Sequence, residues 1–386
     1  LSYSLTADRG PSSVTNSRVV IMAENPWRPS AGDNESSLYI AQLANNELTY
    51  EKKHELNFGI DAGFLNNRIN FTFDIYSRRN YDLIGVINTQ GTGGEPRKYG
   101  NVAKMKSNGV EIALNTVNIK TKDFTWTTDL IYSHMHNEVT ELNTLNRMYD
   151  YISGSGFTMP GYPQRSLFSI PFMGLNNEGL PTFLDQDGNV SVTGINMQEY
   201  DPERLKFLKY EGPVDPTDVG SLGNVFRYKG VTLNLFITYS FGNVVRLDPV
   251  FSSSYSDLTA TPKEFKDRWV KPGDENFTNV PVIASKQQLN NIAYLSTAYQ
   301  AYNYSTERVA KGDFIRMKEI SLGYEFPKSI TQPLRLSNLS LKLMATNLFL
   351  IYADKKLNGQ DPEFFNAGGV ANPMPKQFTL TLKLGI

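Results

Sequence analysis

Residues 378–386 read FTLTLKLGI, and apolar and polar side chains alternate through the whole stretch. A period of two places every second residue, Phe378 to Ile386, on one side of a β-strand. In hydrocarbon every backbone N–H and C=O needs a partner, so a β-structure crosses a membrane only as a closed barrel without an edge. The alternation therefore indicates a barrel strand with one face toward lipid and one toward the lumen.

Length and charge narrow the classes of protein. The chain has 386 residues, with 38 basic and 39 acidic side chains and a net charge of -1. A large barrel reaches this length as one domain, because its repeating unit is the hairpin. The balanced charge provides no overall field that would steer the protein to nucleic acid or to anionic lipid, so nucleic-acid binding is not expected.

Hydropathy excludes a helical membrane protein. The mean hydropathy is -0.36, and no window approaches the roughly 18 to 20 continuous apolar residues of a spanning helix. A barrel stays possible, because its lipid-facing and lumen-facing positions alternate and average to a hydrophilic total. Aromatic residues make up 12% of the chain, which fits the girdles of a barrel and also fits soluble β-proteins.

The start of the chain shows no signal peptide, and the sequence contains no cysteine. Residues 1–6 already alternate like a strand, so we expect the chain to be a piece of a longer protein or a processed form. The targeting segment of an exported protein would then lie upstream of Leu1.

Hairpins recur along the chain. In the clearest one, apolar residues occupy every second position from Leu56 to Phe64 and from Ile69 to Ile75, around a turn at Asn66-Asn67. Similar strand pairs are predicted over residues 110–132, 226–241 and 320–345.

Weaker strand candidates near Leu1, Leu38 and Leu167 bring the count to about eleven. Long connections cover residues 10–50, 140–220 and 242–312, and in a membrane barrel they would be the outer-face loops. About eleven strands are half of the 22 in the largest plugged barrels. The predicted fold class is therefore all-β, a transmembrane antiparallel β-barrel of which the chain supplies half, with long extracellular loops.

Several segments resemble one known family, the SusC/RagA-type TonB-dependent transporters of the Bacteroidetes outer membrane. They follow the family's order and spacing over nearly the whole chain, which makes the match more specific than a single motif. The segments are EKKHELNFGID at 51–61, FLNNRIN at 64–70, NGVEI at 108–112, DFTW at 123–126, GN at 223–224, YKG at 228–230, RW at 268–269, KPGD at 271–274, GDFIRMKEISLGY at 312–324, NLF at 347–349 and DPE at 361–363.

This resemblance implies that residues 1–386 are the C-terminal part of a 22-stranded barrel in the outer membrane of a Gram-negative bacterium. It implies energised import of large nutrients, oligosaccharides or oligopeptides, under a SusD-like surface lipoprotein that caps the outer face. The plug domain, the TonB box and the signal peptide of such a transporter are not present in this chain. Contact with TonB–ExbB–ExbD is therefore expected through a missing N-terminal part. No cofactor is implied.

The choice between the two substrate classes stays open. Residues 161–163 and 166–170 are similar to the RagA-like branch that is associated with peptides, whereas oligosaccharides are the commoner cargo of the family.

Two patterns suggest metal ligands. Asp185, Asp187 and Asn189 stand at the first, third and fifth positions of a calcium loop, but Val190 and Asn196 replace its glycine and its bidentate glutamate. A turn within a loop hairpin is therefore favoured over a calcium site. The other pattern is a pair of histidines, His134 and His136, on one face of a predicted strand; a metal site is not favoured there, because no second shell is evident.

Tyrosines in the long connections are the best candidates for substrate contact. Their flat amphipathic rings can stack on sugars or pack on peptide side chains while the hydroxyls form hydrogen bonds. The alternative is that these rings pack the loops onto the barrel rim. The candidates are Tyr149, Tyr151, Tyr162, Tyr294, Tyr299, Tyr302 and Tyr304.

Two other classes remain as alternatives. A soluble or cell-surface β-rich glycan-binding module would bury its apolar strand faces against a second sheet. A carbohydrate-active enzyme would need a carboxylate pair in a cleft. We do not expect an enzyme, because the sequence has no nucleophile elbow and no phosphate-binding glycine loop.

Overall fold

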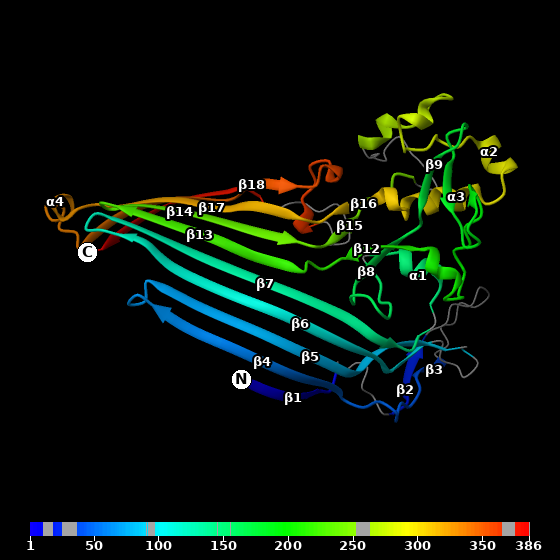
Figure 1. The fold of residues 1–386 in the computed structure, drawn as a ribbon, viewed down its shortest axis with the longest axis horizontal. Helices are drawn as coiled ribbons and strands as arrows, with labels where there is room; N and C mark the ends of the chain where they lie inside the picture. The colour runs from blue at the N-terminus through cyan, green and yellow to red at the C-terminus, as the bar shows by residue number, and fades with distance from the viewer. Residues whose placement is uncertain are drawn as a thin grey trace.

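The computed structural model describes residues 1–10, 18–24, 37–89, 91, 97–144, 146–154, 156–251, 263–364 and 375–385. One curved antiparallel sheet dominates it, with ten strands in the order β1-β4-β5-β6-β7-β13-β14-β17-β18-β19 (Figure 1). The strands lie in the sheet in the same order in which they occur in the sequence. The sheet is therefore an up-and-down meander, as expected for a barrel wall.

The strands of the main sheet are β1 (Ser2–Asp8), β4 (Glu51–Phe64), β5 (Ile69–Asn88), β6 (Arg97–Lys120), β7 (Phe124–Leu142), β13 (Asp218–Tyr228), β14 (Val231–Phe241), β17 (Phe314–Glu325), β18 (Asn338–Ala353) and β19 (Gln377–Gly385). The longest, β6, has 24 residues. A tilted membrane strand needs about 9 to 11 residues, so β6 is long enough to extend well beyond a bilayer.

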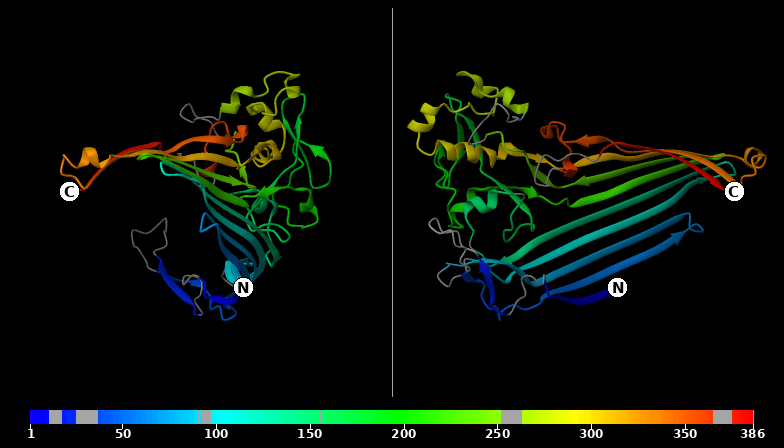
Figure 2. Two further views of the ribbon diagram at one scale, coloured as in Figure 1. Left: turned by 60° about the vertical axis from the view of Figure 1, so that its left-hand side comes forward. Right: turned by 180° about the vertical axis from the view of Figure 1, so that it is seen from behind.

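The sheet forms an open arc, with β1 and β19 at its two edges (Figure 2). Within the described residues, β1 pairs only with β4, and β19 pairs only with β18. The described chain therefore closes no barrel by itself.

Short turns and long connections lie at opposite ends of the sheet (Figure 1). The turn between β4 and β5 uses positive φ angles at Asn66 (57°) and Asn67 (61°), and the turn between β13 and β14 uses them at Lys229 (46°) and Gly230 (91°). Asn and Gly tolerate this left-handed conformation, which confirms both predicted turns. At the same end, α4 (Lys328–Thr331) connects β17 to β18.

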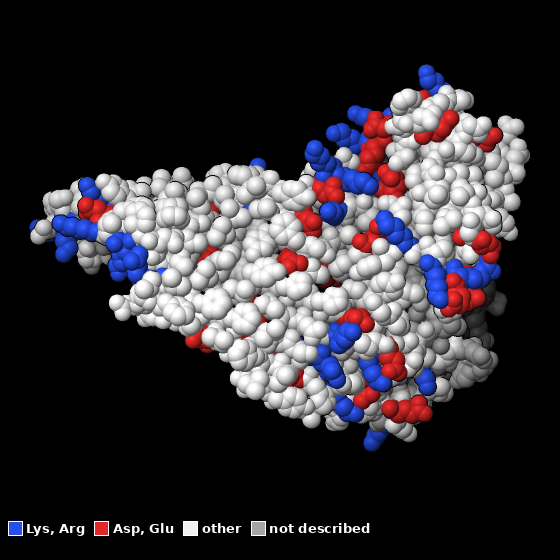
Figure 3. Space-filling view, viewed as in Figure 1, with Lys and Arg blue, Asp and Glu red and all other residues white. Residues whose placement is uncertain are grey.

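Apolar side chains collect on the convex face of the sheet. The strand registers place these residues directly opposite one another, as in Phe58–Ile75, Leu222–Ile237 and Leu322–Leu343–Leu380. Leu222 and Ile237 in the middle of the sheet are partly buried, and the other residues named are exposed, to 69% at Leu380. Figure 3 shows this face as a broad surface almost free of charge between charged groups at its two ends. This is the outer belt that a barrel strand requires.

The concave face carries the polar partners of the same alternation. Its side chains include Asp61, Asp74, Glu111, Asp129 and Glu319. In a closed barrel this face would line the lumen.

The sandwich alternative does not match this arrangement. It requires the apolar strand faces to be buried against a second sheet, whereas the apolar side chains of the convex face are exposed. Nor does any helix in the described ranges combine the length and the apolar character needed to cross a bilayer.

The strand count needs a correction. The candidates near Leu38 and Leu167 do form strands, but outside the main sheet: β3 (Ser37–Gln42) pairs with β2 (Val20–Glu24), and β8 (Ser166–Ser169) pairs with β12 (Lys209–Pro213). These segments have four to six residues, too few to run the length of the neighbouring main-sheet strands. Ile386 lies outside the described residues.

A close contact between neighbouring strands fixes part of the concave face. The Tyr76 ring is 6% exposed and lies over Gly109, where a Cβ atom would come within 2.3 Å of the ring. The Arg78 guanidinium lies 4.0 Å above the same ring and pairs with Glu55 at 2.8 Å. Glycine at position 109 therefore provides the space that the tyrosine fills.

Substitution Gly109→Ala is expected to displace Tyr76 and to lower the free energy of unfolding by about 1–3 kcal/mol, through overpacking. The matched control is Gly223→Ala on the same face, where the new Cβ would meet Phe236 at an ordinary 3.5 Å. Denaturant unfolding of the complete protein in detergent measures both. Equal midpoints for the two variants would contradict the role of this contact.

Candidate functional site

The connections at the end of the sheet opposite the short turns fold into one compact body, here called the loop layer (Figures 1 and 2). It comprises the described parts of residues 143–217, 242–313 and 354–364. Its further elements are α1 (Met148–Ile152), β9 (Phe172–Leu175), β10 (Pro181–Leu184), β11 (Val190–Ser191), β15 (Val244–Arg246), α2 (Lys286–Asn291), α3 (Leu295–Asn303) and β16 (Val309–Lys311).

The loop layer has a hydrophobic core of its own. Met148, Ile152, Ile170, Phe183 and Tyr302 belong to it and are completely buried. They come from α1, β10, α3 and the β8–β9 connection, so distant parts of the chain share one core. Burial of side chains of this size stabilises a domain by about 1.5–3 kcal/mol each. The long connections are therefore folded structure rather than loose loops.

Arg246 joins four segments of this layer. Its Nη1 donates to Ser169 Oγ at 3.1 Å and to Ser305 O at 3.3 Å. Its Nη2 donates to Phe168 O at 2.5 Å and to Ile152 O at 3.5 Å. The residue is partly accessible, but its Nε is closed off from solvent. Desolvation of the enclosed guanidinium lowers the pKa of Arg246 to about 10, so it stays charged at neutral pH.

Two further cations attach the loops to each other and to the sheet. Arg316 on β17 is 4% exposed and pairs with Asp361, which is 6% exposed, in the connection between β18 and β19. Arg308 pairs with Glu264 at 2.6 Å, and Glu264 also accepts a hydrogen bond from Asn358 at 2.7 Å. The connection between β14 and β17 is thus tied to the connection between β18 and β19, and the latter is tied to β17.

The seven candidate tyrosines all lie in the loop layer, in three environments. Tyr299 and Tyr302 are buried in the core, where the Tyr299 hydroxyl donates to Val282 O at 2.6 Å. Tyr294 is 75% exposed and precedes α3. The other four, Tyr149, Tyr151, Tyr162 and Tyr304, are half-buried against other rings. Packing in the core accounts for Tyr299 and Tyr302. Contact of any of the seven tyrosines with a substrate stays a prediction.

Tyr149 and Tyr304 form the best-defined pair of rings. They meet edge to face with their centroids 5.9 Å apart, and their hydroxyl oxygens lie 3.5 Å apart. The Arg246 guanidinium lies 5.8 Å from the centroid of the Tyr304 ring. Burial, with the neighbouring Tyr149 hydroxyl, raises the pKa of Tyr304 to about 12. The Tyr304 hydroxyl therefore stays neutral at physiological pH.

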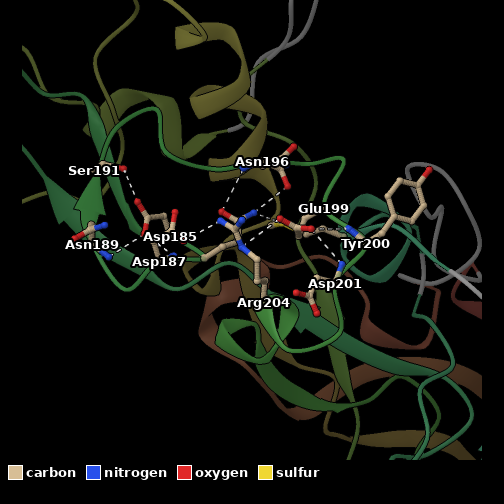
Figure 4. A network of polar contacts seen from close by, with 11 residues as sticks. Asp185, Asp187, Asn189, Ser191, Asn196, Glu199, Tyr200, Asp201 and Arg204 are labelled. Carbon is tan, nitrogen blue, oxygen red and sulfur yellow. Dashed lines mark hydrogen bonds and ion pairs between the residues drawn. The ribbon is translucent and has the colours of Figure 1, made fainter.

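The segment considered as a calcium loop forms the turn between β10 and β11 (Figure 4). The Asp185 carboxylate accepts the backbone N–H groups of Asp187 at 3.0 Å and Asn189 at 2.8 Å. Arg204 pairs with Asp187 at 2.8 Å and with Glu199 at 3.3 Å. The hairpin interpretation is confirmed, and over the described ranges no three His, Asp or Glu side chains converge as metal ligands.

His134 and His136 lie on the convex face of β7, as their spacing predicted. The Nδ1 of His134 is 2.9 Å from Asp218 Oδ1, and Tyr132 donates to the same oxygen at 2.7 Å. This pairing gives His134 a hydrogen-bond partner on the neighbouring strand β13.

Arg246 is the residue that the sequence did not reveal. It follows two valines in a short segment, and no motif or spacing distinguishes it from other arginines. Arg316 and Asp361 each lie in a segment that resembles the family, so the sequence marked both residues. It did not indicate that they form an ion pair with each other.

The fold and the loop layer can now be compared with known proteins. The family profile described as "TonB dependent receptor-like, beta-barrel" matches residues 25–252, more than half of the chain. The chain belongs to this family.

Curated relatives extend the match beyond that segment. TonB-dependent receptor P39 of Formosa agariphila is 26% identical over 380 residues, covering 86% of this chain and 34% of the relative. TonB-dependent receptor SusC of Bacteroides thetaiotaomicron is 26% identical over 373 residues, covering 92% of this chain and 34% of the relative. The chain thus spans about a third of the length of these relatives. Both relatives are named as receptors rather than as enzymes.

A solved structure shows the same fold. The structure of the RagAB peptide transporter superposes with a TM-score of 0.73 and 22% identity, covering 99% of this chain and 40% of that one. The match includes the loop layer as well as the sheet, since it covers nearly the whole chain.

Substitution Arg246→Met is expected to destabilise the loop layer by about 2–4 kcal/mol, because several enclosed acceptors lose their donor. The control Arg204→Met removes only ion pairs of a half-exposed side chain and should cost less than about 1 kcal/mol. Hydrogen exchange and limited proteolysis of the complete protein measure the change. Equal protection in the two variants would show that Arg246 does not hold the layer together.

Proposed function

We propose that this chain forms part of the wall of an outer-membrane importer that takes up large nutrients with energy supplied through TonB. The observation that carries the proposal is the ten-stranded meander with an exposed apolar convex face and a folded loop layer at one end. An apolar belt of this kind suits contact with lipid, and the family membership supports the same assignment. Residues 1–386 would be the C-terminal part of the barrel, with the plug and the TonB-contacting segment elsewhere in the protein.

The loop layer would be the docking surface for a SusD-like lipoprotein. Exposed apolar residues gather in its segment 270–294, namely Val270, Phe277, Ile283, Leu289 and Tyr294. Phe277 is 91% exposed, so a partner that covered it would bury a large apolar side chain and gain binding free energy. Substrate would then be enclosed between this lid and the barrel.

The substrate would be an oligopeptide or an oligosaccharide. The matched structure is described as a peptide transporter, which assigns peptides to that protein. The name of the SusC relative states no substrate. The half-buried rings of Tyr149, Tyr151, Tyr162 and Tyr304 and the exposed ring of Tyr294 suit either class, because each has an apolar face and a hydroxyl.

Deletion of the complete gene is expected to abolish uptake of one labelled class, either oligopeptides or oligosaccharides, and the complete gene expressed with its lipoprotein partner should restore it. The assay measures cell-associated label with and without a functional TonB. Uptake that is unchanged in the deletion strain for both classes would contradict the proposal. A product that stays in solution without detergent would point instead to the binding-module alternative.

Within the same assay, Tyr294→Ala is expected to lower uptake at least about tenfold if this exposed ring contacts substrate or lid. The control Tyr294→Phe keeps the ring and should retain most uptake. Normal uptake by Tyr294→Ala at equal surface expression would remove Tyr294 from the candidate site.

A further inference from the structure

The convex face of β4, β5 and β6 changes character over three successive rows of side chains. The row nearest the short turns is apolar and contains Phe58, Ile75 and Val110. The next row, toward the loop layer, contains Leu56, Ser77 and Asn108. The third row is cationic or basic and contains His54, Arg79 and Lys106. Each residue lies directly opposite its neighbours in its row.

A surface groove runs across the first two rows. It is lined by Leu56, Phe58, Ile75, Ser77, Asn108 and Val110, with His134 and His136 at its β7 side. The floor is apolar, and neutral hydrogen-bonding groups border it on the side of the cations. The polarity of the groove therefore rises in one direction, from the apolar belt toward the loop layer.

Arg79 lacks the acidic partner that neighbouring cations have. Lys52 pairs with Asp82 at 2.8 Å, Lys104 with Glu141 at 2.6 Å and Lys106 with Glu138 at 2.9 Å. In the described part of the chain, no carboxylate lies within ion-pair distance of Arg79, whose side chain is exposed.

Register places Arg79 beside a second cation. Arg79 stands directly opposite His54 and Lys106, and Lys106 is already paired with Glu138 at 2.9 Å, so among the described residues Arg79 is the charged group of this row that has no counter-ion. An anion placed between Arg79 and Lys106 would give Arg79 the partner it lacks, and a guanidinium is well suited to bind phosphate oxygens.

We propose that this groove binds an anionic membrane lipid, with an acyl chain along the apolar row and a phosphorylated headgroup against Arg79 and Lys106. Charge complementarity and the order of the rows select this occupant, because a free anion would leave the apolar floor unused. The site rests on the proposed function, since it requires the convex face to lie in a membrane. Charged groups do gather where the uncharged surface ends toward the loop layer (Figure 3).

Native mass spectrometry of the complete protein in detergent tests the proposal, with dimyristoyl phosphatidylglycerol as the probe. Dimyristoyl phosphatidylcholine, which has the same chains and no net charge, and inorganic phosphate are the comparison ligands. We expect retained phosphatidylglycerol in the wild type and at least a fivefold lower retained fraction in the double variant Arg79→Gln/Lys106→Gln. The matched control Arg227→Gln removes an exposed cation near the short turns and should retain lipid as the wild type does.

Three results would overturn the site: equal retention of phosphatidylglycerol by the double variant, equal retention of phosphatidylcholine by the wild type, or inorganic phosphate binding as strongly as the lipid. Loss of folding is checked by denaturant unfolding without lipid, where the double variant should unfold close to the wild-type midpoint, because the Lys106–Glu138 pair that it loses is solvent-accessible and contributes little. Failure of the importer proposal would appear separately, as solubility without detergent or as uptake that does not depend on the gene.

Discussion

Backbone hydrogen bonding is the constraint on which the rest of this structure depends. In hydrocarbon an unpaired N–H or C=O costs several kcal/mol, so every strand that crosses must be paired on both sides. The eight inner strands of the main sheet meet this condition within the described residues, whereas β1 and β19 pair on one side only. The open edges therefore require further strands before such a sheet can lie in a membrane. The alternation of apolar and polar side chains follows from the same constraint, because successive side chains of a paired barrel strand point alternately to the lipid and to the lumen.

The length of the strands links the sheet to the loop layer. Strands such as β6 and β7 are longer than a bilayer requires, so in the proposed importer they would carry the connections away from the membrane surface. There the connections bury a core of their own and enclose cations, of which Arg246 contacts three other segments. A layer built in this way holds its exposed side chains in fixed positions. In the proposed importer it would be a preorganised surface for a lid and for substrate, which would lower the entropy cost of binding.

Much of the sheet was predictable from sequence, because one rule governs it at every position. A period of two and the turn residues Asn66, Asn67 and Gly230 specify the hairpins locally. Short strands such as β3 and β8 were misplaced, because pattern alone does not say which sheet a strand joins. The loop layer was not predictable for a related reason. The role of Arg246, the burial of Tyr302 and the exposure of Tyr294 all depend on contacts between distant segments, which no local pattern encodes.

The claim that the convex face lies in lipid is tested most directly by single-cysteine scanning of β14, because the chain contains no native cysteine. A spin label at each position from 231 to 241 of the complete protein, reconstituted in bilayers, reports access to oxygen and to a water-soluble nickel reagent. The account predicts alternation with a period of two, in which Leu233, Leu235 and Ile237 favour oxygen while Thr232, Asn234 and Phe236 favour nickel. Equal access to nickel along the whole strand would contradict it.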